Sequence, residues 1–169
     1  MTNTATKDIE EKVTSTITAG KYLSFFLGAE EFAIPVSSVR EIMGLQDITP
    51  VPKTPPYVRG VFNLRGRVIP VMDMRRKCGL ADIEYTAHAC IIVVQIKKDG
   101  GWAPMGIVVD GVSEVVNIAL SDTEPMPEFG TERQAYLLGV AKLKDKVKIL
   151  LDIDRMLGTS EILNLGTAA

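Results

Sequence analysis

The chain has 169 residues, 46% of them hydrophobic and 24% charged, and its formal net charge is -2. This length holds one ordinary domain or two small ones, and the balanced charge excludes the basic surface of a nucleic-acid-binding protein. No apolar run approaches the roughly 20 residues that cross a bilayer, and no secretory signal opens the chain, so we expect a soluble cytoplasmic protein without direct membrane insertion.

Ordered structure is predicted to begin at Lys21. Residues 1–20 are rich in Thr, Ala and charged side chains without a sustained period, so they are interpreted as a flexible N-terminal arm. The next runs, YLSFFLG and EEFAIPV, are apolar and are separated by Gly28 and Ala29. This pattern predicts a β-hairpin.

The segment VREIM, residues 39–43, spaces its apolar residues like one face of a short helix. Ser37 or Ser38 is the expected N-cap, and Gly44 is the expected end. The stretch that follows, residues 48–60, contains four prolines. Because proline supplies no backbone N–H, this stretch is predicted to be a fixed loop rather than a helix or a central strand.

Two strand-like runs, GVFNL and RVIPVMD, meet at Arg65 and Gly66, where glycine permits the positive φ of a tight turn. Pro70 lies inside the second run. It predicts either an edge strand or a place where a bulge is tolerated. The following MRRKCG predicts a helical turn that ends at Gly79.

The second half of the chain predicts a similar series of elements. Strands in ACIIVVQIKK and GWAPMGIVVDGV are joined near Asp99 and Gly100, and the polar residues 120–134 are the candidate variable or ligand-facing loop. Another hairpin turns at Lys144 and Asp145 and leads into IDRML, which predicts a short helix.

The two series form an internal repeat. Residues 57–79 align with residues 136–158 without a gap, and 8 of the 23 positions are identical. Alternation of apolar and polar residues alone would not place Gly, Asp and Arg at matching positions, so we interpret the chain as a duplication. A weaker repeat, at an offset of 73, matches Val39, Glu41 and Ile42 with Val112, Glu114 and Val115.

Short strands at close spacing predict a mainly all-β fold of two small barrels that share one core, with a few short helices. No helix of 10–15 residues alternates with the strands, so parallel α/β layers are not expected. The first barrel is expected over about residues 21–85 and the second over about residues 88–158, with terminal segments able to cross over. Residues 159–169 are expected to form a tail.

Catalytic and metal-binding groups are sparse in this sequence. His88 is the only histidine, and Cys78 and Cys90 lack the C-x-x-C spacing of zinc or redox motifs, so free thiols, no metal and no cofactor are expected. Asp73 and Asp152 match in the repeat and suggest a carboxylate pair like that of aspartic proteases. Neither lies on the small-residue turn of that chemistry, so helix capping is the favoured role and no catalytic residue is assigned.

Glu41 and Arg65 are the remaining candidates. The turn at Gly66 needs glycine, but nothing in it needs arginine, and packing accounts for the apolar neighbours of Glu41 without accounting for the acid. A solvated charge is the usual explanation of one such residue. Together with the proline-rich loop, the two charges indicate a docking surface.

Three segments carry a resemblance to a known family: FFLGAEEFAIPVSSVREIM, TPPYVRGVFNLRGRVIPVMDMR and MGIVVDGVSEVV. Their order and spacing resemble the CheW family of chemotaxis coupling proteins over about residues 21–158. The resemblance implies a non-enzymatic adaptor built from two SH3-like five-stranded β-barrels that share a hydrophobic seam. Such adaptors link transmembrane chemoreceptors, the methyl-accepting chemotaxis proteins, to the regulatory domain of the histidine kinase CheA in membrane-associated arrays.

The resemblance also implies site residues. In the family, the cytoplasmic hairpin tip of the receptor lies in a groove near the first copy, and an ion pair between Glu41 and Arg65 would order the turn. The kinase is expected at pseudo-equivalent barrel ends. The residues carried over to this sequence are Val39, Glu41, Gly60 and Arg65 for the receptor, and Gly106 and Val112 for the kinase.

Two other functions remain open. A stand-alone small-ligand-binding β-barrel protein would use the groove between the barrels, and a hydrolase would use Asp73 with Asp152. The sequence contains neither a kinase core nor a receiver domain, which favours a free-standing coupling protein.

Overall fold

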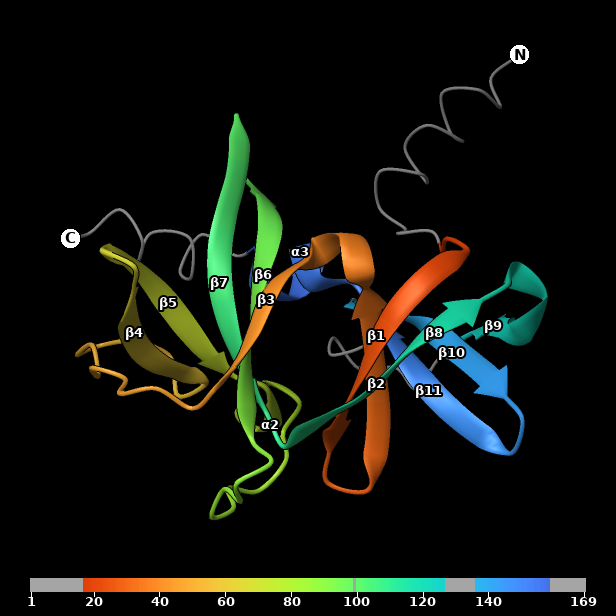
Figure 1. Cartoon of the computed structure of the whole chain (residues 1–169), viewed down its shortest axis with the longest axis horizontal. Coiled ribbons are helices and arrows are strands. Elements are labelled where there is room, and N and C mark those ends of the chain that lie inside the picture. The colour runs from red at the N-terminus through yellow and green to blue at the C-terminus, as the bar shows by residue number, and fades with distance from the viewer. Residues whose placement is uncertain (1–16, 99, 127–135, 159–169) are drawn as a thin grey trace.

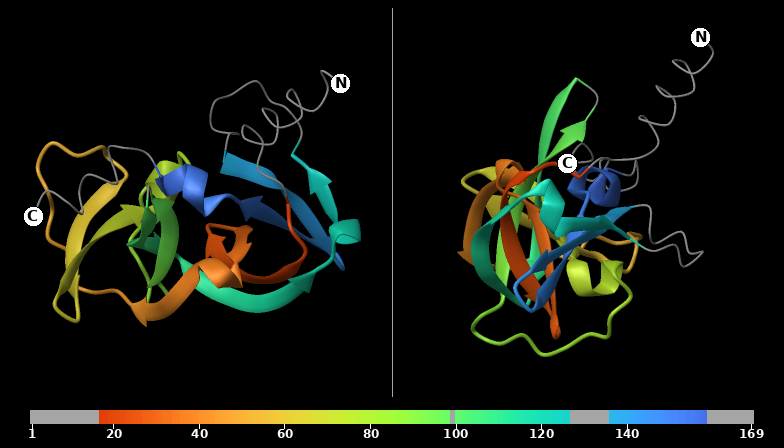
Figure 2. Two further views of the ribbon diagram at one scale, coloured as in Figure 1. Left: turned by 90° about the horizontal axis from the view of Figure 1, so that it is seen from above. Right: turned by 90° about the vertical axis from the view of Figure 1, so that its right-hand side faces the viewer.

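The computed structural model describes residues 17–98, 100–126 and 136–158. Strands dominate these ranges, as predicted, and they form two small SH3-like units that lie side by side in Figures 1 and 2. The first 16 residues of the expected arm, Asp99 of an expected turn, residues 127–134 of the polar loop with the adjoining residue 135, and the expected tail lie outside the described residues.

We name each unit after the residue at its equivalent hairpin turn. The Arg65 barrel has the strand order β3 (Val39–Gly44), β6 (Cys90–Lys98), β7 (Gly101–Val109), β5 (Arg67–Asp73) and β4 (Val58–Leu64). The Lys144 barrel has the order β8 (Gly111–Ile118), β1 (Gly20–Leu27), β2 (Glu30–Pro35), β11 (Lys146–Leu151), β10 (Leu137–Leu143) and β9 (Thr123–Pro125). The three-residue β9 is a sixth strand that the sequence did not predict.

The two copies exchange their first hairpins. The N-terminal hairpin β1–β2 pairs with β8 and β11, which lie in the C-terminal half of the chain, whereas β6–β7 pairs with β3 and β5. Figure 1 shows the result, with the red and orange strands β1 and β2 beside the blue strands β10 and β11. Neither barrel is therefore a continuous segment of the chain, and the terminal segment crosses over between them.

The repeat is visible in the strand registers. The hairpin β4–β5 has a register shift between Val58 and Gly60, and the hairpin β10–β11 has the same shift between Leu137 and Gly139. Each second strand then continues into a parallel pairing, β5 with β7 and β11 with β2. The predicted duplication is thus confirmed at the level of hydrogen-bonded partners.

Two short helices occur where the sequence predicted them, after the repeated hairpins. The helices α2 (Met74–Lys77) and α3 (Ile153–Leu157) follow β5 and β11 directly. The side chain of Asp73 accepts a hydrogen bond from the Arg76 amide, and Asp152 does the same for Arg155. The two acids are N-caps, as predicted. Two 3-10 turns, η1 (Val36–Ser38) and η2 (Leu120–Asp122), are the remaining elements of the described ranges.

The prediction of a helix over residues 39–43 was wrong. Those residues form β3, and only the preceding η1 is helical. Val39 already has the extended values φ -91° and ψ 130°, and the strand pairs with β6 from Val39 to Gly44. Cross-strand pairing outweighs the local spacing of apolar residues, and a bulge before Glu41 shifts the register that spacing would suggest.

Pro70 lies in a strand that has neighbours on both sides, so the edge-strand alternative was wrong, whereas the register shift between Val58 and Gly60 of the adjacent β4 agrees with the alternative of a tolerated bulge. The proline is tolerated because β5 pairs with β7 only from Val71 onward, and Pro70 itself faces a neighbour on the β4 side alone. The missing N–H therefore interrupts no ladder between β5 and β7.

One apolar core joins the barrels. It contains residues from strands of both barrels and from both helices. Phe25, Met72, Ile92 and Met156 are among them, and each is completely buried. The helix α3 lies at the junction of the barrels in Figures 1 and 2 and contributes three residues to this core. Because the core is shared, we expect the two barrels to unfold together. Among the described residues, no helix combines the length and the apolar character that membrane crossing requires.

Candidate functional site

The turn between β4 and β5 places Arg65 at the tip of the Arg65 barrel. Arg65 has a positive φ of 50°, and Gly66 follows with φ 85°. The Gly66 amide donates a hydrogen bond of 2.7 Å to Oδ1 of Asn63, which closes the turn without using the arginine side chain. That side chain is 69% exposed, so neither the turn nor the core requires it.

The ion pair that the resemblance implied is present. Nη1 of Arg65 lies 3.1 Å from Oε1 of Glu41, and Nη2 contacts the second carboxylate oxygen, so the guanidinium binds the carboxylate with two nitrogens. Glu41 comes from β3, whereas Arg65 comes from the β4–β5 turn. An exposed pair of this kind contributes only about 0–1 kcal/mol to stability. Its main effect is to hold both charges in one orientation at the surface.

Gly60 lies in β4, the strand that leads to the Arg65 turn, and packs closely against the proline-rich loop. Its φ is 140°, and a Cβ atom at this position would lie 2.0 Å from the carbonyl oxygen of Thr49. That close approach accompanies two backbone hydrogen bonds between Thr49 and Val61, which fasten the proline-rich loop to β4. Val39, at the start of β3, packs against the shared core. Gly60 is therefore buried and Val39 half-buried, so neither presents an exposed side chain at this face.

The two residues carried over for the kinase are not gathered on one surface. Gly106 is buried in β7, where an added Cβ would lie 3.0 Å from the Ile91 side chain. Val112 belongs to the other barrel and packs partly against the shared core. A buried glycine cannot touch a partner, so Gly106 can influence binding only through the packing of the Arg65 barrel.

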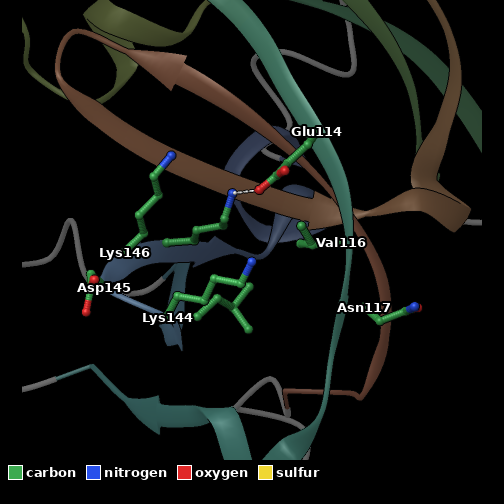
Figure 3. Close-up of a pocket in the computed structure, with 8 residues that line it drawn as sticks. Glu114, Val116, Asn117, Lys144, Asp145 and Lys146 are labelled. Carbon is green, nitrogen blue, oxygen red and sulfur yellow. Dashed lines mark hydrogen bonds and ion pairs between the residues drawn. The ribbon is translucent and has the colours of Figure 1, made fainter.

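The Lys144 barrel carries a groove at the position that corresponds to the Glu41–Arg65 site. The groove has a volume of about 590 Å³, with walls from β8 on one side and from the β10–β11 turn and β11 on the other. Figure 3 shows its lining side chains. The lining residues are Glu114, Val116, Asn117, Leu143, Lys144, Asp145, Lys146 and Lys148. By the offsets of 73 and 79, they correspond to Glu41, Met43, Gly44, Leu64, Arg65, Gly66, Arg67 and Ile69.

Lys148 forms a buried polar cluster at the base of this groove. The lysine is only 1% exposed, and its ammonium lies 2.6 Å from Oε2 of Glu31, 3.0 Å from Oε1 of Glu114 and 3.1 Å from Oγ of Ser24. These contacts use all three N–H donors of the ammonium. The cluster joins β11 to β2, β1 and β8, and Figure 3 shows the contact with Glu114 as a dashed line.

The pKa values of this cluster favour the charged pair. Burial by itself raises the pKa of Glu31, but the hydrogen bond and charge of Lys148, with help from Ser113 and Lys146, lower it below its ordinary value. Burial likewise lowers the pKa of Lys148, but hydrogen bonds to Glu31 and Glu114 outweigh that effect and raise it. Lys148 and Glu31 are therefore ionised together at neutral pH.

A third polar cluster fastens the segment after α2. The Asp73 side chain accepts hydrogen bonds from Arg59, at 3.3 Å, and from the Tyr85 hydroxyl, at 3.1 Å. Burial, with the adjacent Asp73 charge, raises the pKa of Tyr85 to about 12. Arg76 forms two hydrogen bonds with Asp82. These contacts tie the connection between the barrels to β4 and α2, which is a structural role.

The sequence did not single out Lys148 or Glu31. The sequence nevertheless contained a signal for this cluster, because the repeat aligns Lys148 with Ile69. The Ile69 side chain is apolar and points into its barrel. A lysine at an inward-facing repeat position predicts a buried partner of opposite charge. Cys78 and Cys90 are not joined in a disulfide, and burial raises the pKa of the Cys90 thiol.

Comparisons with known proteins agree with this arrangement. A family model described as the CheW-like domain matches residues 21–161. The chain is 36% identical over 143 residues to the chemotaxis protein CheW of Klebsiella aerogenes, covering 84% of each chain. It is 36% identical over 138 residues to the chemotaxis protein CheW of Bacillus subtilis, covering 81% of this chain and 85% of the relative. The crystal structure of the scaffolding protein TtCheW from Thermoanaerobacter tengcongensis matches with a TM-score of 0.75 at 30% identity, covering 85% of this chain and 96% of that one.

Proposed function

Because this chain belongs to the CheW-like family of non-catalytic chemotaxis scaffold proteins, we propose that it couples transmembrane chemoreceptors to the histidine kinase CheA. The observation that carries the proposal is the pair of Arg65 and Glu41. Two nitrogens of an exposed guanidinium are fixed on a carboxylate at the tip of a turn that would form without them. Such a pre-oriented pair suits recognition better than it suits stability.

We propose that the receptor tip docks on the Glu41–Arg65 face, above the surface shaped by Gly60 and Val39. Through this contact the protein would be recruited to membrane-associated receptor arrays. The backbone under the face is held by the Thr49–Val61 bridge, so the side chains stand on a rigid support. A partner would meet charges that are already ordered, which lowers the entropy cost of binding.

The variant Arg65→Glu tests the receptor site. It should fold like the wild type, because the side chain is 69% exposed, but binding of a soluble receptor-tip fragment at this face should weaken by at least about tenfold, because the reversed charge faces Glu41 and the partner. Lys97→Glu is the matched control, since it reverses an exposed cation on the β6–β7 hairpin. Unchanged capture by Arg65→Glu would remove this residue from the site.

For the kinase, we propose docking of its regulatory domain, a like-shaped barrel pair, against the barrel ends. Each barrel exposes the same two apolar repeat positions: Ile42 and Val68 are 45% and 48% exposed, and their counterparts Val115 and Val147 are 58% and 52% exposed. Exposed aliphatic residues at matching positions favour two related interfaces. Capture of the isolated regulatory domain by Ile42→Arg and Val115→Arg identifies the barrel that binds, and full capture by both variants would contradict the proposal.

The small-ligand alternative has one observation in its favour, the groove of about 590 Å³ in the Lys144 barrel. Sites for small molecules usually bury most of the ligand surface. This groove has walls from β8 and from the β10–β11 hairpin only, so a contact with a larger partner suits it better.

A further inference from the structure

The two barrels carry the same site in two chemical versions. All eight residues that line the groove of the Lys144 barrel have a repeat counterpart around the Glu41–Arg65 pair. The backbones of the two tips agree at the first turn residue, where φ is 50° at Arg65 and 58° at Lys144, and differ at the second, where Gly66 has a φ of 85° but Asp145 has no positive φ. A partner that fits one tip therefore meets a related, though not identical, turn at the other.

The strands that flank the two tips also agree in register. In the Arg65 barrel, Val39 and Ile42 pair with Val94 and Ile92. In the Lys144 barrel their counterparts, Val112 and Val115, pair with Phe25 and Leu23 through the same one-residue shift. The acid of each site, Glu41 in β3 and Glu114 in β8, thus lies at the equivalent position of the equivalent strand.

A single buried difference changes the rim of the second site. In the Arg65 barrel, the base position is Ile69, so Glu41 is available to Arg65. In the Lys144 barrel, the base position is Lys148. Its buried ammonium forms an ion pair with Glu114 at 3.0 Å. The rim cation is therefore left without the acid that its counterpart binds.

Lys144 is accordingly an available cation. It forms no ion pair within residues 17–98, 100–126 and 136–158, and Figure 3 shows its side chain reaching from the turn into the groove toward Val116. Lys146 is 68% exposed and lies 3.7 Å from Glu31, while Asn117 adds an amide and Leu143 an apolar wall. The carboxylates of Glu114 and Asp145 also line the groove, but Glu114 is paired with Lys148, so Lys144 remains available to a carboxylate that is flanked by apolar side chains.

We propose that this groove is a second docking site for a helical receptor tip, which presents a carboxylate to Lys144. The inference rests on the proposed function, because it takes the Arg65 face as the first receptor site. It goes beyond that function by giving one adaptor two receptor-binding faces on opposite copies of the repeat. One molecule then bridges two receptor tips, and the linked sites add avidity without any new contact.

The stoichiometry of binding tests the proposal. The full 169-residue chain is titrated with a soluble helical-hairpin fragment of a chemoreceptor tip, and calorimetry and sedimentation velocity give the number of fragments bound. The wild type is expected to bind two. Lys144→Asn removes the charge with a residue that tolerates a positive φ, and Lys144→Glu reverses it. Each variant should retain one binding event, with the second weakened by about tenfold or more.

The matched variant Arg65→Glu should also retain one event, and the double variant with Lys144→Glu should retain none. One bound fragment for the wild type, with unchanged binding by both Lys144 variants, would overturn the second site while leaving the proposed function intact. No binding by the wild type would instead reject the proposed function. Circular dichroism of each variant establishes that a lost event does not reflect unfolding.

Discussion

The two barrels of this chain share a backbone but differ in what they bury. The Arg65 barrel fills its interior with Phe62, Ile69 and Val93, all at most 4% exposed. The corresponding positions of the Lys144 barrel hold Ala141, Lys148 and Ser24, and the lysine and serine are joined by a hydrogen bond of 3.1 Å. Duplication thus preserved the pairing of strands while one interior became smaller and polar.

This difference means that the two barrels depend on different interactions for their stability. An apolar interior stabilises a barrel through the removal of apolar surface from water, at about 25 cal/mol per Å². A buried ion pair contributes little net stability but is costly to break, because the remaining charge loses its partner. We therefore expect the Lys144 barrel to be more sensitive to single substitutions in its polar base, and the Arg65 barrel to be more sensitive to changes of backbone shape.

The largest effect is expected from Lys148→Ala. Removal of the lysine leaves the carboxylate of Glu31 buried without its 2.6 Å partner, and such a loss typically costs about 3–5 kcal/mol of unfolding free energy. Urea denaturation measures it. Lys146→Ala is the matched control, since this lysine is 68% exposed and lies 3.7 Å from the same acid, so a cost of about 0–1 kcal/mol is expected.

A double variant separates the charge from the shape of this site. Lys148→Ile with Glu31→Gln gives the Lys144 barrel the apolar residue that its counterpart carries and removes the orphaned charge. Replacement of both partners is often nearly neutral, so the double variant should regain much of the lost stability. Equal instability of the double variant and Lys148→Ala would show that packing, rather than the unpaired acid, causes the loss.

The next effect compares two glycines at one repeat position. A Cβ at Gly60 would lie 2.0 Å from the Thr49 carbonyl oxygen, and one at Gly139 would lie 2.3 Å from that of Glu124. Gly60 also has a φ of 140°, so Gly60→Ala adds backbone strain to the clash. We expect losses of about 1–3 kcal/mol, larger for Gly60→Ala than for Gly139→Ala.

Thermal unfolding of both variants ranks the two positions. Gly44→Ala is the control, because no atom lies within 4 Å of the added Cβ and its φ is not in the left-handed region. A cost at Gly44 as large as that at Gly60 would indicate a general effect of glycine replacement in this chain, and the close approach would no longer explain the difference.

Much of this architecture could be predicted from residues alone. The duplication, the turn at Arg65, the hairpin turn at Lys144 and the capping by Asp73 follow from local chemistry that is written in a few adjacent residues. The exchange of hairpins could not be derived in this way. It depends on which strands become neighbours in the folded protein. For example, Glu31 of β2 pairs with Lys148 of β11, although more than 110 residues separate them along the chain.

At the candidate site, too, some features could be predicted from the sequence and others could not. The resemblance led to Glu41 and Arg65, and the structure brings these two side chains together. It could not show that Gly106 is buried, nor that Lys148 reaches Glu114, because both facts depend on the closure of a barrel. The strand over residues 39–44 was missed for a related reason, since its pairing with β6 outweighs the helical spacing of its apolar residues.

A smaller effect is expected from acid. The pKa of Glu31 is lowered in the folded protein, so the stability that its ionised form contributes is complete above its unfolded pKa of about 4.3 and is lost as the pH falls through the folded value. Melting temperatures measured from pH 7 downward should therefore fall below about pH 4. In Glu31→Gln this part of the slope should be missing, and an unchanged acid slope would assign it to other carboxylates.

The smallest effect concerns the two exchanged hairpins, which differ in length. Hairpin β1–β2 ends with the pair Leu27 and Glu30, whereas β6–β7 continues to the pairs of Lys97 with Trp102 and of Lys98 with Gly101. Trp102 is the only tryptophan of the chain and is 58% exposed. Its one aromatic contact among the described residues is with the Lys97 ammonium, 5.9 Å from the ring centroid.

An exposed contact of this kind contributes little, so Trp102→Ala should change the unfolding free energy by no more than about 0.5–1 kcal/mol. Met105→Ala in the same strand is the contrast, because Met105 is 1% exposed and belongs to the shared core, where such a truncation costs about 2–5 kcal/mol. Denaturation followed by circular dichroism measures both. If Trp102→Ala were as costly as Met105→Ala, the extended tip would be part of the folding core, and the two hairpins would differ in stability as well as in length.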